Sequence, residues 1–260
     1  MAMFWDVEDW MRERDGVPYI ELEPIVKSGI ALSVVSTRIG GISSPPYHEL
    51  NLGSHVGDDP EKVRGNRKRF ALATDIDLES LRLPRQIHSA ECIVLTKPDE
   101  SIGECDGVIT DLKGIALGVL TADCAPILLV APSFGVVGVA HAGWRGTLAG
   151  IAKNALELMI GRFKVDPSDC LAVIGPSIGR CCYEVSEALA SKFRSRFGPQ
   201  VVSGRHVDLP LANALSLVRM GVPEGRIWIC RSCTACREDI FFSHRRDGLT
   251  GRMLSLVVLI

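Results

Sequence analysis

The chain has 260 residues, of which 47% are hydrophobic and 23% are charged, and its formal net charge is −2. Such a length and composition are typical of a globular protein that can bury a sizeable core. The near-neutral balance excludes a chain-wide basic field that would attract nucleic acid or an anionic membrane, so any anion site must be local.

The N-terminal residues lack the basic segment and the long apolar core of a signal peptide. No apolar stretch is long enough for a transmembrane helix. We therefore expect a cytoplasmic protein that binds neither nucleic acid nor membrane. The nine cysteines are odd in number, so free thiols or metal ligands are expected rather than a disulfide framework. Four of them are interpreted as small buried apolar residues: Cys92, Cys105, Cys170 and Cys181.

The first half of the chain predicts strands and one helix. Residues 17–20 are expected to form an edge strand, and residues 29–38 a strand that ends at the Gly40-Gly41 turn. Asp58-Asp59 followed by Pro60 is typical of a helix N-terminus and predicts a helix over 60–74. Short apolar runs then predict strands at 92–96, 107–110, 115–121, 127–131 and 136–140.

The second half alternates between helices and strands. Apolar residues at helical spacing predict a helix over 146–163. Further helices are expected at 185–197 and 206–219, and strands at 170–174, 226–230 and 253–260. Several strands are apolar on both faces, which indicates a sheet covered on both sides. With no repeat or linker, residues 1–260 are expected to form one α+β domain with helices outside mixed sheets.

Three possible metal ligands follow or end strand-like runs: His88, Cys124 and His141. Gly143 and Gly146, just after His141, would let the backbone approach a ligand closely. Three nitrogen and sulfur donors can converge on one zinc ion and leave its fourth position open, as in a catalytic site. Such an ion would lower the pKa of a bound water to about 7 or polarise a substrate atom. The sequence leaves open whether the three residues meet in space.

Four further residues are candidates for catalysis. Asp123 could orient a ligand histidine, or it could simply cap a turn. Arg38 and Arg145 lie in glycine-containing turns that suit a phosphate or carboxylate, although each could instead pair with a structural carboxylate. Asn51 is a weaker candidate for a supporting group. Neither turn matches a Walker loop or a dinucleotide-binding fingerprint.

A cysteine-rich stretch contains Cys230, Cys233 and Cys236. The C-x-x-C spacing suits zinc, but a structural site normally pairs two separate stretches of this kind, and only this one is present. We therefore assign no role to these three residues from the sequence. The nearby segment 243–248 is expected to be an arginine-bearing turn close to the site.

Seven segments resemble the YfiH-like laccase-domain family, whose members are also called polyphenol oxidases or purine nucleoside phosphorylases. They are NLGSHVGDDPEKVRGNR (51–67), QIHSA (86–90), DGVIT (106–110), ALGVLTADCAPILL (116–129), GVAHAGWRG (138–146), IGPSIGRCCYEV (174–185) and FFSHRRDGLTGR (241–252). The resemblance covers nearly the whole chain after residue 30, and TADC followed by AHAGWRG is highly specific.

The resemblance implies a four-layer α/β/β/α fold and a zinc ion held by His88, Cys124 and His141. It also implies phosphorolysis of adenosine, inosine, guanosine or S-methyl-5'-thioadenosine, with some adenosine deamination. Family members usually carry glycine after the first histidine, where this chain has Ser89. We expect this difference to alter the fit of the substrate rather than to remove the metal.

Three alternatives stay open. A copper-dependent polyphenol oxidase needs many imidazoles, usually as His-x-His pairs, and the chain has 6 histidines and no such pair, although soft ligands can take copper. A hydrolase could use Cys124 as nucleophile with His141 or His88 as base. A binding protein could hold a purely structural metal. The favoured reading is a zinc-dependent purine nucleoside phosphorylase that acts on small molecules as a monomer or weak homo-oligomer.

Overall fold

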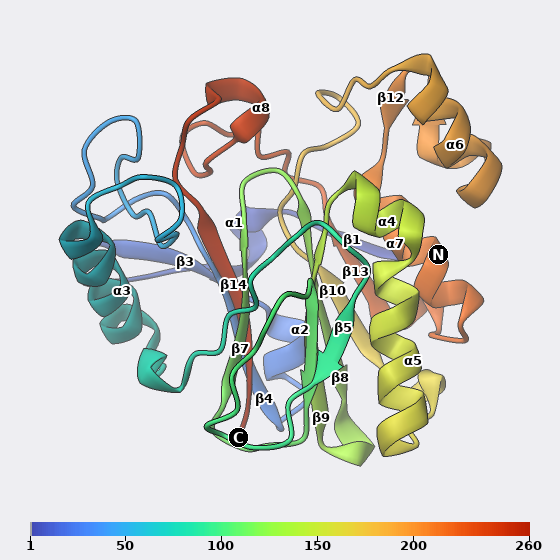
Figure 1. The fold of residues 1–260 in the computed structure, drawn as a ribbon, viewed down its shortest axis with the longest axis horizontal. Coiled ribbons are helices and arrows are strands. Elements are labelled where there is room, and N and C mark those ends of the chain that lie inside the picture. The colour runs from blue at the N-terminus through green and yellow to red at the C-terminus, as the bar shows by residue number, and fades with distance from the viewer. Residues whose placement is uncertain (1) are drawn as a thin grey trace.

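Two large β-sheets pack face to face in the computed structural model, which describes residues 2–260 (Figure 1). The seven-stranded sheet contains, in spatial order, β1 (Met3–Trp5), β13 (Ile227–Cys230), β10 (Leu171–Ile174), β8 (Ala125–Ala131), β9 (Val136–Ala142), β6 (Gly107–Thr110) and β5 (Cys92–Val94). The five-stranded sheet contains β2 (Met11–Arg14), β3 (Val17–Glu21), β4 (Ala31–Ser36), β14 (Met253–Leu259) and β7 (Ala116–Thr121).

The two sheets differ in strand direction. In the seven-stranded sheet, β1, β13 and β10 run parallel to one another, and so do β5 and β6, whereas β10, β8, β9 and β6 are joined by antiparallel pairings. All four pairings in the five-stranded sheet are antiparallel. The expectation of mixed sheets is therefore confirmed for the first sheet and corrected for the second.

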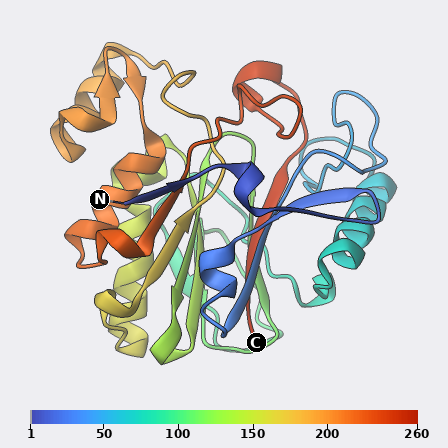
Figure 2. The same cartoon turned by 180° about the vertical axis from the view of Figure 1, so that it is seen from behind.

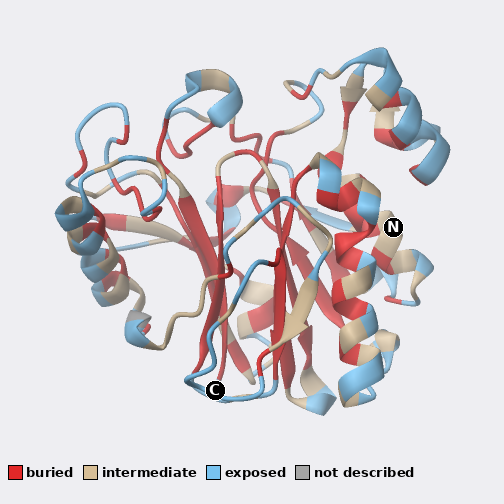
Figure 3. Cartoon of the chain, viewed as in Figure 1, coloured by how far each residue is buried: buried red, intermediate tan, exposed pale blue. Residues whose placement is uncertain are grey.

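The apolar core has three main layers because the side chains of each strand alternate between its faces. On β8, Leu128 and Val130 face the other sheet, and Ile127 and Leu129 face helices. Helices α5 (Ile151–Phe163) and α7 (Leu209–Arg219) cover the seven-stranded sheet, whereas α3 (Pro60–Thr74) covers the five-stranded sheet with Phe70. The central strands are buried and the helices are exposed on their outer faces, which confirms the four-layer α/β/β/α fold (Figure 3).

Shorter elements complete the chain. The helices are α1 (Val7–Trp10), α2 (Glu23–Val26), α4 (Trp144–Ala149), α6 (Glu187–Phe197) and α8 (His244–Asp247). The 3-10 turns are Leu78–Ser80, Pro132–Phe134, Pro167–Asp169, Pro199–Val201 and Glu224–Arg226, and a small hairpin joins β11 (Val202–Ser203) to β12 (His206–Val207). Helices α6 and α8 lie at the end of the sheets opposite the C-terminus (Figure 2). Within residues 2–260, none of the helices combines the length and the apolar character needed to cross a bilayer.

Three predicted elements need correction. The helix expected over 146–163 is two helices, because Gly150 adopts a left-handed φ of 98° that ends α4 before α5 begins. The strand at 17–20 is not at an edge, because a tight turn at Asp15-Gly16 folds β2 back onto β3. The helix expected from 206 begins at Leu209, because His206 and Val207 pair with β11.

The expectation for the buried cysteines is also corrected in part. Cys105 and Cys170 are buried and Cys92 is half-buried, but Cys181 is exposed. Cys181 lies in the irregular segment after β10, where the sequence has no apolar periodicity that would indicate burial. Two of the cysteines near it, Cys233 and Cys236, come from a distant part of the chain.

Candidate metal centre

The three predicted metal ligands lie close together in the structure. The donor atoms of His88, Cys124 and His141 all lie within 4.8 Å of one another. The two imidazole rings meet edge to face with their centroids 4.9 Å apart. His141 is buried, Cys124 is half-buried and His88 is exposed, so the cluster extends from the interior of the protein to the solvent.

The strands explain how these three side chains come together. Pro126 of β8 pairs with His141 of β9, so the turn before β8, which carries Cys124, lies beside His141. The sequence placed His141 after its strand, but β9 continues to Ala142 and holds the imidazole rigidly. His88 reaches the cluster from the loop before β5, in a left-handed conformation with a φ of 59°.

Asp106 organises the cluster, and sequence analysis did not single it out. One oxygen of its fully buried carboxylate accepts a 2.8 Å hydrogen bond from Nδ1 of His141, which leaves Nε2 of that ring free to bind a metal ion. The backbone N–H groups of Ile87, His88 and Ser89 also donate to this carboxylate, at 3.2, 3.1 and 2.6 Å. Asp106 therefore orients one histidine directly and the other through its loop. An acidic residue directly before a buried strand is the signal that could have revealed it.

The hydrogen bonds of Asp123 favour the second of its two expected roles, support of a turn. Its carboxylate accepts a 2.7 Å hydrogen bond from Oγ1 of Thr234 and a 2.6 Å hydrogen bond from the backbone N–H of Arg245. The carboxylate that is bonded to a histidine of the cluster is that of Asp106. Asp123, with a φ of 92°, instead joins the turn of Cys124 to the segment around α8.

The electrostatics of the cluster favour a thiolate. Burial opposes ionisation of the Cys124 thiol, but the charges and hydrogen bonds of His141 and His88 outweigh it and lower the pKa of this thiol to about 6. Burial likewise opposes protonation of His141, but Cys124 and Asp106 together raise the pKa of its imidazole to about 9. A thiolate is the form of cysteine that binds metal.

The two predicted arginines occupy different surroundings. The Arg145 guanidinium lies over the Trp144 ring at 4.4 Å, and no hydrogen-bond acceptor contacts it among residues 2–260. Burial raises the pKa of the Tyr183 hydroxyl, the charge of Cys124 raises it further, and the charge of Arg145 opposes this rise. The Arg38 guanidinium instead donates to the carbonyl oxygens of His48 and Glu238 and lines a separate surface hollow.

Asn51 is buried and committed to its own loop. Its Oδ1 accepts hydrogen bonds from the backbone N–H groups of Gly53 and Arg252, and its amide donates to Asp58. Burial lowers the pKa of the Arg252 guanidinium, and the charges of Cys124 and Asp123 partly oppose this shift. Asn51 thus supports the segment that carries Arg252.

Comparison with known proteins agrees with the fold. Residues 32–260 match the family model described as multi-copper polyphenol oxidoreductase laccase. The chain is 41% identical to a protein of Geobacillus stearothermophilus named purine nucleoside phosphorylase YlmD, over 87% of this chain and 89% of that one. It is 37% identical to a protein from an unknown prokaryotic organism named adenosine deaminase RL5, over 88% of this chain and 95% of that one.

A solved structure gives the same result. The crystal structure of YlmD from Geobacillus stearothermophilus matches with a TM-score of 0.89 at 38% identity, covering 98% of this chain and 99% of that one. The extent of these matches leaves one conclusion: the chain belongs to the laccase-domain, YfiH-like family.

Proposed function

We propose that this chain is a zinc-dependent purine nucleoside phosphorylase. Its substrates would be adenosine, inosine, guanosine and S-methyl-5'-thioadenosine, with adenosine deamination as a side activity. The observation that carries the proposal is the convergence of His88, Cys124 and His141, in a chain similar to proteins named for these two activities.

The donor set fits a catalytic zinc ion. One thiolate and two imidazoles are ligands that zinc prefers, and catalytic sites use three protein ligands so that the fourth position stays open. Exposure of His88 gives a substrate access to the centre. When bound, zinc supplies a Lewis acid that polarises a substrate or phosphate oxygen. Copper also binds such soft ligands, and we propose zinc because the chain lacks the many histidines of a multicopper oxidase.

The residues of the chain would hold the reactants. Phosphorolysis breaks the bond between the ribose C1' and the purine nitrogen and joins C1' to a phosphate oxygen. Arg145 is the proposed phosphate contact, because its guanidinium is exposed and has no protein acceptor within the described chain. Asp106 would keep His141 oriented during turnover.

Arg38, Asn51 and Asp123 would act by positioning other groups. The side chain and the backbone carbonyl of Arg38 both hold the segment 48–50. Asn51 holds the backbone of Arg252, and Asp123 holds the turn of Cys124 against Thr234. We also propose that residues 1–260 form one catalytic domain of a cytoplasmic enzyme, which works as a monomer or weak homo-oligomer.

The test is an assay of the purified enzyme with adenosine, inosine, guanosine and S-methyl-5'-thioadenosine, with and without phosphate. We expect release of the free base only with phosphate, together with formation of ribose 1-phosphate or its methylthio analogue. Chelation of the metal should abolish the reaction, and added zinc should restore it. Equal release of base without phosphate would contradict phosphorolysis, and release of ammonia alone would assign the chain to adenosine deamination.

One contact favours a second candidate, a hydrolase with a cysteine nucleophile. Cys124 is hydrogen-bonded to His141, and His141 is hydrogen-bonded to Asp106. This arrangement matches a nucleophile, a base and a carboxylate that orients the base. That arrangement leaves His88 without a role. Alkylation of Cys124 in metal-free protein separates the two candidates: a hydrolase would be fully active without metal until it is alkylated, whereas the phosphorylase would already be inactive.

A further inference from the structure

Four cysteines outside the first centre form a second cluster. The sulfur atoms of Cys181, Cys182, Cys233 and Cys236 all lie within 4.8 Å of one another. Sγ of Cys236 is 3.3 Å from that of Cys182 and 3.6 Å from that of Cys181. All four are free thiols, and these separations far exceed the S–S bond of about 2.05 Å in a disulfide.

The topology of the seven-stranded sheet brings these residues together. Strands β10 and β13 are parallel neighbours, so the chain leaves both strands at the same edge of the sheet. The loop after β10 carries Cys181 and Cys182, and the loop after β13 carries Cys233 and Cys236. A bridge between Ser177 and Cys233 continues the strand pairing into the two loops.

The backbone closes around the sulfur atoms. The N–H of Gly179 donates a 3.1 Å hydrogen bond to Sγ of Cys233, and the N–H of Thr234 donates to the carbonyl of Ser177 at 3.0 Å. A side-chain carbon at Gly179 would lie 3.2 Å from Cβ of Cys233 and 3.3 Å from Sγ of Cys181. The two loops are therefore fixed against each other at the cluster.

We propose that Cys181, Cys182, Cys233 and Cys236 bind one zinc ion in a structural site. Zinc bound by four thiolates is tetrahedral with Zn–S bonds of about 2.3 Å, which places the sulfur atoms roughly 3.8 Å apart. The two separations from Cys236, 3.3 and 3.6 Å, are close to that value, and the other pairs lie within 4.8 Å. A four-iron cluster would hold its cysteines farther apart. Because the protein supplies all four ligands, the site is closed and has no position for a substrate.

An arginine supports the turn between two of these cysteines. Four thiols release their protons to the solvent when zinc binds, and the site then carries a charge of about −2. The Arg246 guanidinium donates to the carbonyl oxygens of Thr234 and Ala235, at 2.9 and 3.3 Å, within the turn between Cys233 and Cys236. Because this guanidinium is also paired with the Asp247 carboxylate, its contribution is to hold the turn rather than to neutralise the site.

The second cluster is connected to the first centre. Both loops contact Asp123: the N–H of Ile178 donates to its carbonyl at 2.8 Å, and Oγ1 of Thr234 donates to its carboxylate at 2.7 Å. Cys124 is the next residue. A zinc ion that joins the two loops would thus also stabilise the turn that presents Cys124.

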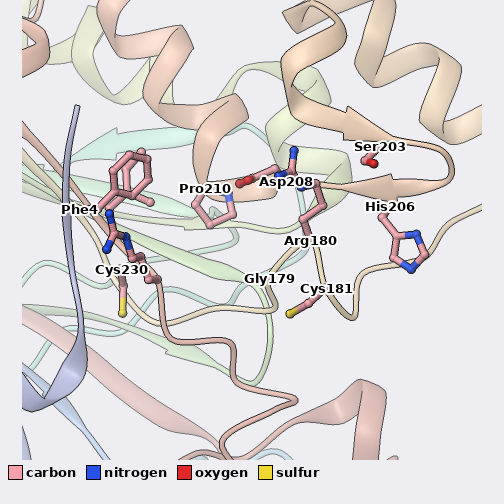
Figure 4. Close-up of a pocket in the computed structure, with 11 residues that line it drawn as sticks. Phe4, Gly179, Arg180, Cys181, Ser203, His206, Asp208, Pro210 and Cys230 are labelled. Atoms are coloured by element: carbon pink, nitrogen blue, oxygen red, sulfur yellow. The ribbon is translucent and has the colours of Figure 1, made fainter. Parts of the chain in front are cut away.

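Cys230 provides a matched control. It forms a C-x-x-C unit with Cys233, so spacing alone would include it, yet it is not a member of the cluster. Figure 4 shows Cys181 and Cys230 on different parts of the wall of one surface pocket, with the Gly179-Arg180 segment between them. Replacing Cys230 should therefore leave the second zinc ion in place.

The experiment measures zinc per chain in protein purified from zinc-replete cells under reducing conditions. We expect two equivalents in the wild type and in Cys230→Ala, and one equivalent in Cys181→Ser/Cys182→Ser. A Cys124→Ala variant should keep one equivalent, with four sulfur ligands at about 2.3 Å by X-ray absorption. Because that variant lacks a ligand of the first centre, the result does not depend on the proposed function.

Several results would overturn the proposal. These are the absence of zinc from the Cys124→Ala variant, nitrogen or oxygen ligands in that variant, iron in place of zinc, or no loss of zinc in Cys181→Ser/Cys182→Ser. If that double variant does not fold, the single substitution Cys236→Ser replaces it, because Cys236 is exposed. Titration of the Cys124→Ala protein with Co²⁺ alone gives an independent measurement, since tetrahedral thiolate coordination has an intense visible absorption.

Discussion

Asp106 and His141 form a buried carboxylate–imidazole pair, with Oδ1 of the first 2.8 Å from Nδ1 of the second. The same carboxylate accepts three backbone N–H groups from the loop that carries His88. A single residue outside the set of predicted ligands therefore holds two of the three predicted ligands. It positions both histidines through hydrogen bonds that do not depend on a metal ion.

Asp106→Asn should weaken metal binding and also lower stability. The amide has nearly the same shape as the carboxylate, but it lacks the charge that increases the basicity of His141, and its NH2 group would face donors that the carboxylate oxygens now accept from. We expect zinc affinity and kcat/KM to fall about 10- to 100-fold. Competition with a chromogenic chelator measures the affinity. Asp111→Asn, on an exposed residue just after β6, is the control, and an unchanged affinity in Asp106→Asn would contradict this role.

Gly143→Ala should disturb the first centre without straining the backbone. The φ and ψ of Gly143, −78° and 177°, suit alanine, but the new methyl group would lie 3.0 Å from Sγ of Cys124 and 3.2 Å from Cδ2 of His88. We expect a loss of zinc affinity with a small change in melting temperature. In Gly161→Ala, where the methyl group meets nothing within 4 Å inside α5, stability should instead rise by about 0.5–1 kcal/mol.

Arg145→Met should raise the KM for phosphate. A charged hydrogen bond contributes roughly 1.5–3 kcal/mol, so the increase should be on the order of 10- to 100-fold. The zinc content should not change, because Arg145 is not a ligand. Arg145→Lys keeps the charge and should restore part of the affinity for phosphate. Steady-state kinetics with varied phosphate check this expectation, and an unchanged KM would exclude Arg145 from the phosphate site.

Ser89→Gly should affect stability more than substrate fit. The hydroxyl of Ser89 donates a 2.8 Å hydrogen bond to the Asp106 carboxylate and accepts one from the N–H of Glu91 at 3.0 Å. It is thus committed to the support of the centre, so we expect a loss of about 1–2 kcal/mol in the free energy of unfolding. Zinc should remain, and the KM for each nucleoside should stay near that of the wild type. Denaturant unfolding and kinetics together test this; a changed order of nucleoside preference would show that Ser89 contacts the substrate.

Acid should weaken the attachment of α1. Hydrogen bonds from Arg237 lower the pKa of Glu8 and of Asp239. Because both folded values lie below the unfolded ones, this stabilisation is complete above the unfolded pKa of about 4 and is lost as the pH falls through the folded values. Both carboxylates are largely exposed, so Arg237→Met should cost at most about 1 kcal/mol at pH 7. At pH 2 the melting temperature of Arg237→Met should equal that of the wild type. Arg162→Met is the control, and its melting temperature should equal that of the wild type at both pH 7 and pH 2.

The sequence by itself determined most of the elements and the three donors of the first centre. Helix α3 was predicted from its Asp59 cap and Pro60, and the buried strands from short apolar runs, because these signals are local in the chain. His88, Cys124 and His141 were singled out because each follows or ends a strand-like run, and such positions are visible in the sequence.

The tertiary structure alone decided which distant residues meet. Asp106 reaches His141 because β6 and β9 are antiparallel neighbours, and Cys182 reaches Cys236 because β10 and β13 are parallel neighbours. Neither neighbour relation follows from local periodicity, since strand order depends on how the sheets pack. For the same reason, the sequence could not show that Arg38 lines a separate surface hollow. It also could not show that Cys230 lies outside the four-cysteine cluster, although its C-x-x-C spacing to Cys233 would include it.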